Sequence, residues 1–124
     1  MEKSRMAHKN RILAIPLTSF AAASLTASYQ AINSNGLDEA CFLLRIINEN
    51  STGITISYDG INDHDFLAGT AAAIPREILE LDFSAGSHSG SPLKFAKGMK
   101  VYVKGSAGVG TIYLSGYYHS ENGR

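Results

Sequence analysis

Short runs in which apolar and polar residues alternate constrain the fold of this chain more than any other feature. The alternation is clearest in residues 54–58, 78–83, 100–104 and 111–118. Side chains of a β-strand point alternately to opposite faces of the sheet, so each run has one face for a core and one for solvent or a partner. A helix would need apolar residues three and four positions apart, which these runs do not supply. The pattern predicts β-strands.

Three further segments are expected to add strands. Residues 41–47 are almost continuously apolar, which is typical of a central strand covered on both faces, although the length also permits a short helix. Residues 25–32 and 92–98 alternate less regularly, and clusters of Gly, Asn, Asp and Ser separate the runs. About eight short strands at even spacing predict an all-β fold, a single β-sandwich of jelly-roll or Greek-key type.

Composition narrows the class of protein. The 124 residues suit one domain, and 44% hydrophobic with 18% charged residues exclude a wholly disordered chain. Eleven basic and eleven acidic residues cancel, so there is no electrostatic reason to expect a nucleic acid partner. Zero net charge also gives a free monomer little colloidal protection, which favours a protein that works in an assembly. The single cysteine, Cys41, leaves no internal disulfide.

The amino-terminal residues divide into a basic stretch and an apolar stretch. The order resembles a signal peptide, but Pro16 interrupts the apolar run, which is too short to span a membrane as a helix. We therefore expect residues 1–20 to form an extended arm and residues 21–124 to form the sandwich. The arm is expected to contact acidic patches on a neighbouring subunit through its four basic side chains, Lys3, Arg5, Lys9 and Arg11.

Residues 59–65 raise the question of a metal or catalytic site. The spacing of the acids differs from that of an EF-hand loop, the histidines have no zinc-ligand spacing, and no nucleophile motif such as GxSxG occurs. We therefore predict no catalytic residue, no metal and no cofactor, and no enzymatic activity. The segment is expected to be a hairpin turn in which Asp59 and Asn62 bond the backbone, followed by a strand that begins near His64.

Tyrosines near the carboxyl end offer contact material. Tyr102 and Tyr113 alternate with buried aliphatic positions, so their rings are expected on outward strand faces, where aromatic side chains suit protein interfaces. For Tyr117 and Tyr118, a role in closing the core is an equal alternative.

Two phrases of the sequence carry a family resemblance. The stretch ISYDGINDHDFL and the later stretch LKFAKGMKVYVKGSAGVGTIYLSGYY resemble small virion structural proteins of tailed bacteriophages, over about residues 24–118. The resemblance implies a β-sandwich or jelly roll that is part of the virion, assembled in the cytoplasm of the bacterial host. It assigns no chemical role to any residue.

Several functions remain open at this point. The first expectation is a capsid decoration (cement) protein that binds and stabilises neighbouring capsid subunits, as a homo-oligomer and without nucleic acid or membrane. A head–tail junction or tail accessory protein is the alternative in the same class. A glycan-binding sandwich that uses exposed tyrosines, or a small enzyme at Asp63, His64 and Asp65, would belong to other classes.

Overall fold

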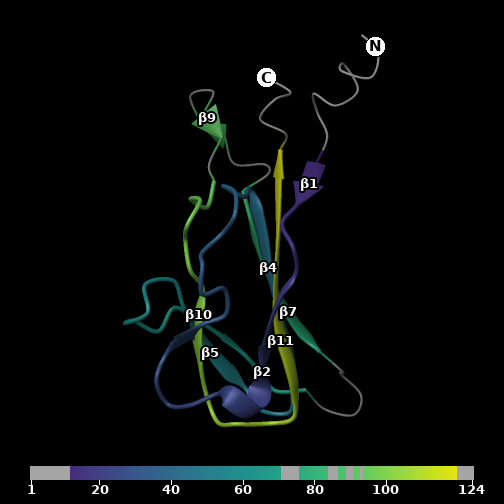
Figure 1. Ribbon diagram of the computed structural model, residues 1–124, viewed down its shortest axis with the longest axis vertical. Helices are drawn as coiled ribbons and strands as arrows, with labels where there is room; N and C mark the ends of the chain where they lie inside the picture. The colour runs from purple at the N-terminus through teal and green to yellow at the C-terminus, as the bar shows by residue number, and fades with distance from the viewer. Residues whose placement is uncertain (1–11, 71–75, 84–86, 89–90, 93, 120–124) are drawn as a thin grey trace.

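The computed structural model describes residues 12–70, 76–83, 87–88, 91–92 and 94–119. In these residues it contains one short 3-10 turn, η1, and eleven β-strands (Figure 1). The elements in chain order are β1 (Ile12–Ala14), β2 (Thr18–Ala21), η1 (Ala22–Ser24), β3 (Gln30–Ala31), β4 (Leu43–Asn50), β5 (Ile54–Ser57), β6 (Asp65–Leu67), β7 (Glu77–Asp82), β8 (Ser87–His88), β9 (Ser91–Pro92), β10 (Tyr102–Lys104) and β11 (Gly110–His119).

The strands form two antiparallel sheets and a small separate hairpin. We call sheet A the sheet with strand order β1–β11–β4–β7, in which β2 also pairs with β11, and sheet B the sheet with order β3–β10–β5–β6. Strands β8 and β9 pair only with each other among the described strands. Figure 1 shows sheet B beside sheet A, with β4 next to the long strand β11.

The topology is that of a jelly roll. We count β1 and β2 as one interrupted strand and leave out the β8–β9 hairpin, and we number the remaining eight strands 1 to 8 in chain order. With this numbering the strand order is 1-8-3-6 in sheet A and 2-7-4-5 in sheet B. This order is produced by two interleaved Greek keys. The predicted all-β sandwich is confirmed.

The amino-terminal edge of sheet A corrects the predicted domain boundary. β1 pairs with β11 from Ile12↔His119 to Ala14↔Tyr117, and β2 resumes at Thr18↔Leu114. Three residues, including Pro16, therefore oppose two on β11, which is a β-bulge. A proline lacks the N–H that a regular strand would need, so the bulge accommodates it. Residues 12–20, predicted to lie in an arm, are part of the sandwich, whereas residues 1–11 lie outside the described residues.

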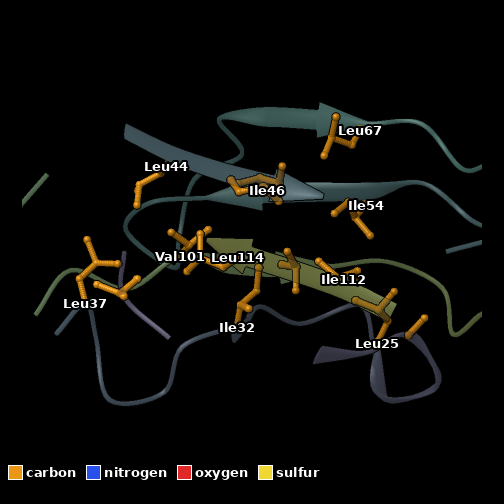
Figure 2. Close-up of a cluster of buried hydrophobic side chains, with 14 of the residues drawn as sticks. Leu25, Ile32, Leu37, Leu44, Ile46, Ile54, Leu67, Val101, Ile112 and Leu114 are labelled. Carbon is orange, nitrogen blue, oxygen red and sulfur yellow. The ribbon is translucent and has the colours of Figure 1, made fainter. Parts of the chain in front are cut away.

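The core lies between the two sheets and consists mainly of aliphatic side chains. Leu44 and Ile46 of β4 and Ile112 and Leu114 of β11 are fully buried on the inner face of sheet A. They belong to one cluster with inner-face side chains of sheet B such as Val103. Figure 2 shows Ile54 and Val101, which lies just before β10, in the same cluster. The residues from β5, β10 and β11 belong to the apolar sets that the alternation predicted, whereas Leu44 and Ile46 belong to the continuous apolar run 41–47.

β4 differs from the prediction in one respect. It is a strand, and it is central in sheet A, between β11 and β7. Its exposure alternates along its whole length, and Leu43, Arg45, Ile47 and Glu49 are only half-buried on the outer face. The expectation of cover on both faces was wrong for the described residues, because another sheet packs against the inner face only.

Two buried asparagines end the inner face of β4. Asn48 donates through Nδ2 to the carbonyl oxygens of Thr52 and Ala68, and Asn50 donates through Nδ2 to the carbonyl and hydroxyl oxygens of Thr52. The two side chains tie the segments after β4 and β6 to the end of the sheet. The sequence suggested only a turn here, and the strand in fact continues through Asn50.

The weaker strand predictions were met in part. Within residues 25–32 only Gln30–Ala31 forms a strand, although Leu25 and Ile32 are buried. In residues 92–98 Phe95 forms an isolated bridge with Cys41, and Leu93 lies outside the described residues. No helix in the described part of the chain is long and apolar enough to cross a bilayer.

Neighbouring residues of β4 provide a test of this fold. Ile46 is fully buried and Ile47 is half-buried on the outer face. Ile46→Ala should lower the free energy of unfolding by about 2–5 kcal/mol, because it removes contacts and leaves a cavity. Ile47→Ala should lower it by about 1 kcal/mol or less. Urea unfolding of both variants measures the difference, and equal losses would contradict the assignment of faces.

Candidate interaction surface

The acidic segment after β5 is a hydrogen-bonded turn. Asp59 Oδ1 accepts the backbone N–H groups of Ile61 and Asn62 at 2.8 Å each and the Ser57 hydroxyl at 2.9 Å, and Asp59 Oδ2 accepts the Asn62 side-chain amide. Gly60 has a φ of 79°, a left-handed conformation that glycine adopts without strain. The hydrogen bonds to the charged form hold the pKa of Asp59 well below its usual range.

The other side chains of this turn also have protein partners. Tyr29 donates to Asp63 Oδ1 at 2.5 Å, and Lys104 Nζ lies 3.0 Å from the same oxygen. Tyr58 donates to Asp65 Oδ2 at 2.6 Å and stacks on the His64 ring. Burial and the hydrogen bond to Asp63 raise the pKa of Tyr29 to about 12, and the bonds from Tyr29 and Lys104 lower the pKa of Asp63.

These contacts account for the cluster of polar side chains in residues 59–65 without a bound ligand. β5 and β6 pair from Ile54↔Leu67 to Ile56↔Asp65, so the predicted hairpin and the bonding role of Asp59 are confirmed, and the strand begins at Asp65, one residue after His64. In the described part of the chain, no group of three or more His, Cys, Asp or Glu side chains is arranged to hold a metal ion. His119 stacks on Phe42, far along the chain from the turn.

Cys41 is the other reactive residue type in the described chain. Cys41 is fully buried, and this burial is the main reason why the pKa of its thiol is raised to about 11. The negative charges of Glu39 and Asp38 raise the pKa further. The thiol is therefore protonated at neutral pH and enclosed by the core.

The outer face of sheet A carries an apolar groove. Its floor is made by neighbouring side chains of three adjacent strands, Tyr113, Ile47 and Ile78, which are aligned across the sheet. Leu17, from the bulge between β1 and β2, lines the groove and is 60% exposed. The groove has a volume of about 390 Å³. We call this surface the sheet A groove.

Charged side chains border the sheet A groove. Arg45 Nε lies 2.8 Å from Glu80 Oε2, and Arg76 Nη1 lies 3.9 Å from Glu49 Oε2. All four side chains are 40% or more exposed, so each ion pair contributes little to folding. An apolar centre with a charged border is the arrangement found in protein–protein interfaces.

The predicted contact residues do not share one surface. Tyr113 lies in the sheet A groove, as an outward position of β11. Tyr102 belongs to β10 in sheet B, where its ring packs under Gly60 of the acidic turn. The two rings are on opposite sheets and cannot bind a single ligand together. Lys3, Arg5, Lys9 and Arg11 lie outside the described residues.

Sequence reasoning missed most of the sheet A groove. Ile47 was assigned to a continuous buried run, and Ile78 was not compared with Glu80, although both point outward on β7. The available signal was an apolar residue at a position in phase with charged ones, such as Ile47 between Arg45 and Glu49.

Comparisons with known proteins add little to this geometry. No protein-family model matches the chain, and no curated protein matches it. Among solved structures, the chain is similar to a protein described under "Bacillus endospore appendages form a novel family of disulfide-linked pili". The identity is 10%, the match covers 89% of each chain, and the TM-score is 0.48. Likeness at this level supports no conclusion about what this chain binds.

The acidic turn predicts a particular pH dependence. Asp59 has a lower pKa in the folded chain than the value of about 3.9 typical of an unfolded one. Its ionised carboxylate therefore stabilises the fold above about pH 4, and this contribution is lost as the pH falls further. The gap in urea midpoint between the natural protein and Asp59→Ala should narrow between about pH 6 and pH 2.5. A gap that stays constant would contradict the role of the carboxylate.

Proposed function

We propose that this chain is a structural subunit of a tailed-phage virion, and specifically a capsid decoration protein that binds and stabilises neighbouring capsid subunits. The observation that carries the proposal is the sheet A groove, an exposed apolar surface made by side chains of three adjacent strands. The resemblance of residues 24–118 to small virion proteins supplies the kind of assembly. The major capsid protein is the expected occupant of the groove.

The exposed apolar residues of sheet A support a protein partner. Ile12 is 59% exposed, Leu17 is 60% exposed and Ile78 is 48% exposed, and all three lie on strands or the bulge of this sheet. Removing apolar surface from water is favourable by roughly 25 cal/mol per Å². A partner with its own apolar side chains would gain this free energy, and the mixed charges at the border would select its orientation.

A shallow groove is adequate for a protein that binds a repeated lattice. One such contact is small compared with the interfaces of stable soluble complexes. Many copies on a symmetric shell, each touching more than one capsid subunit, bind with an avidity well above that of the single contact. Weak individual contacts are therefore compatible with a cementing role.

A junction or tail accessory protein would use the same groove. It differs from a decoration protein in its location and copy number, which a low-resolution image of the particle would distinguish. The glycan-binding alternative gains no support from the tyrosines, because Tyr102 and Tyr113 lie on opposite sheets.

The proposal predicts co-sedimentation with particles. In a gradient of lysate from the cells that produce the chain, an antibody to it should label the fraction that contains the major capsid protein. Nuclease treatment should not release it. A chain found only in the light fractions, as a free protein, would overturn the virion proposal.

The sheet A groove can be tested separately by charge substitution. Ile78→Glu places a carboxylate on the floor of the groove and should reduce binding to purified particles about tenfold or more, since a buried unpaired charge is costly. Ile61→Glu, in the exposed turn after β5, is the matched control and should bind normally. Circular dichroism should show that both variants fold. Equal binding by both would place the contact elsewhere.

A further inference from the structure

The edges of the two sheets differ in how open they are. Sheet B ends in β3 and β6, which have two and three residues. Sheet A ends on one side in β1 and β2, which the bulge at Pro16 interrupts. On its other side β7 pairs with β4 over six residues without a break. Short or bulged edges resist pairing with another strand, whereas a long regular edge invites it.

At alternate residues of β7, the backbone N–H and C=O groups point away from β4, toward the open edge of sheet A. The N–H of Phe83 donates to Phe42 O across the β4–β7 pair. Because hydrogen-bonded positions alternate along an antiparallel pair, Leu79 and Leu81 bond toward β4. The N–H and C=O groups of Ile78 and Glu80 then point away from the sheet. No described strand pairs with β7 on that side.

The side chains of β7 restrict what can pair with it. The strand contains three acids, and one base, Arg76, precedes it. Glu80 and Asp82 lie on the outer face with Ile78, whereas Glu77 lies on the other face with Leu79 and Leu81. A second copy of β7 would bring these acids against each other, and like charges on opposing strands are destabilising. A basic strand would instead gain cross-strand ion pairs.

The chain itself contains a segment of that chemistry. Residues 1–11 have four bases and one acid, a net charge of +3, whereas the described residues have nine acids and six bases, a net charge of −3 with histidine neutral. The four bases, Lys3, Arg5, Lys9 and Arg11, all have odd numbers. In an extended segment they would fall on one face.

We propose that residues 1–11 of one copy bind as an added antiparallel strand on β7 of a neighbouring copy, with the basic face on the same side of the sheet as Glu80 and Asp82. This inference rests on the proposed function, since it describes how copies are joined within an assembly. Main-chain hydrogen bonds supply the affinity of such strand addition, and the charges supply its direction and register.

Distances favour a neighbouring copy over the same copy. A strand added antiparallel to β7 ends beside Glu77, whereas Ile12 lies beside His119 at the other end and the other edge of sheet A. Six residues of strand cover about 20 Å and the four strand spacings from the added strand to β1 about 19 Å, so the two points are about 28 Å apart. The six steps from residue 6 to Ile12 reach at most about 22 Å when fully extended. A strand along the whole of β7 therefore comes from another molecule.

Disulfide trapping tests the contact in the full-length protein. Lys3→Cys and Glu80→Cys chains, mixed and gently oxidised, should give a crosslinked heterodimer that mass spectrometry identifies, because residue 3 shares the face of Glu80 in the proposed strand. Cys41 is buried and should not compete. The control replaces Glu80→Cys by Ile61→Cys, which is 80% exposed in the turn after β5, and should give at least about fivefold less heterodimer. Equal yields, or no heterodimer, would overturn the inference.

The double variant Lys3→Cys/Glu80→Cys separates the two sources of the strand. Addition between copies should give disulfide-linked chains of several copies. A disulfide closed within one chain would show that the segment folds back on its own β7, and this outcome would overturn the inference.

Charge exchange gives an independent readout. The change Lys3→Glu/Arg5→Glu should weaken self-association about tenfold in sedimentation velocity, and Glu80→Lys/Asp82→Lys should do the same. Mixing the two variants should restore association, because opposite charges again face each other. Lys97→Glu/Lys100→Glu makes the same charge change on exposed residues of the segment before β10 and should have no effect. Failure of the mixture to recover would contradict the pairing.

The outcomes also separate this inference from the proposed function. If the chain binds particles but does not self-associate through residues 1–11, the decoration role is supported and the strand addition is wrong. If disulfide-trapped heterodimers form but the chain never sediments with particles, the strand addition is supported and the virion proposal is wrong.

Discussion

The contact between the inner faces of the two sheets holds the rest of the structure in place. Leu44, Ile46, Ile112 and Leu114 of sheet A are fully buried against the aliphatic side chains of sheet B. No disulfide can reinforce this contact, because the chain has one cysteine. Since side chains alternate along a strand, burying one face also fixes which residues point outward. The outer groove and the outward groups of β7 are therefore consequences of how the core is packed.

The core was readable from the sequence because its signal is local. Each buried position of β5, β10 and β11 alternates with a polar or exposed one within a few residues. The acidic turn was readable for the same reason, since Asp59 bonds groups two and three residues away. Strand existence and turn chemistry depend on neighbours in the chain, and one sequence contains that information.

The remainder depends on residues that are distant in the chain. The amino-terminal strands pair with β11, about a hundred residues later, and their apolar residues alone did not distinguish an arm from a sheet edge. The sheet A groove is made by β4, β7, β11 and the bulge between β1 and β2, so no single run of sequence contains it. Tyr102 and Tyr113 have equivalent sequence patterns, yet chain topology places them on opposite sheets. Alternation reports a two-sided strand, and only the topology says which partner each side meets.

A sandwich has four edge strands, and the treatment of those edges distinguishes a protein that remains free from one that assembles. Natural sheets interrupt, shorten or charge their edges to prevent uncontrolled pairing. Here β3 and β6 are short, the edge formed by β1 and β2 is bulged, and only β7, among the described edges, is both long and regular. Its acids oppose pairing with itself but not with a basic strand. An edge strand that disfavours pairing with a second copy of itself and favours pairing with a basic strand is consistent with selective assembly. This edge lies beside the sheet A groove, to which β7 contributes Ile78.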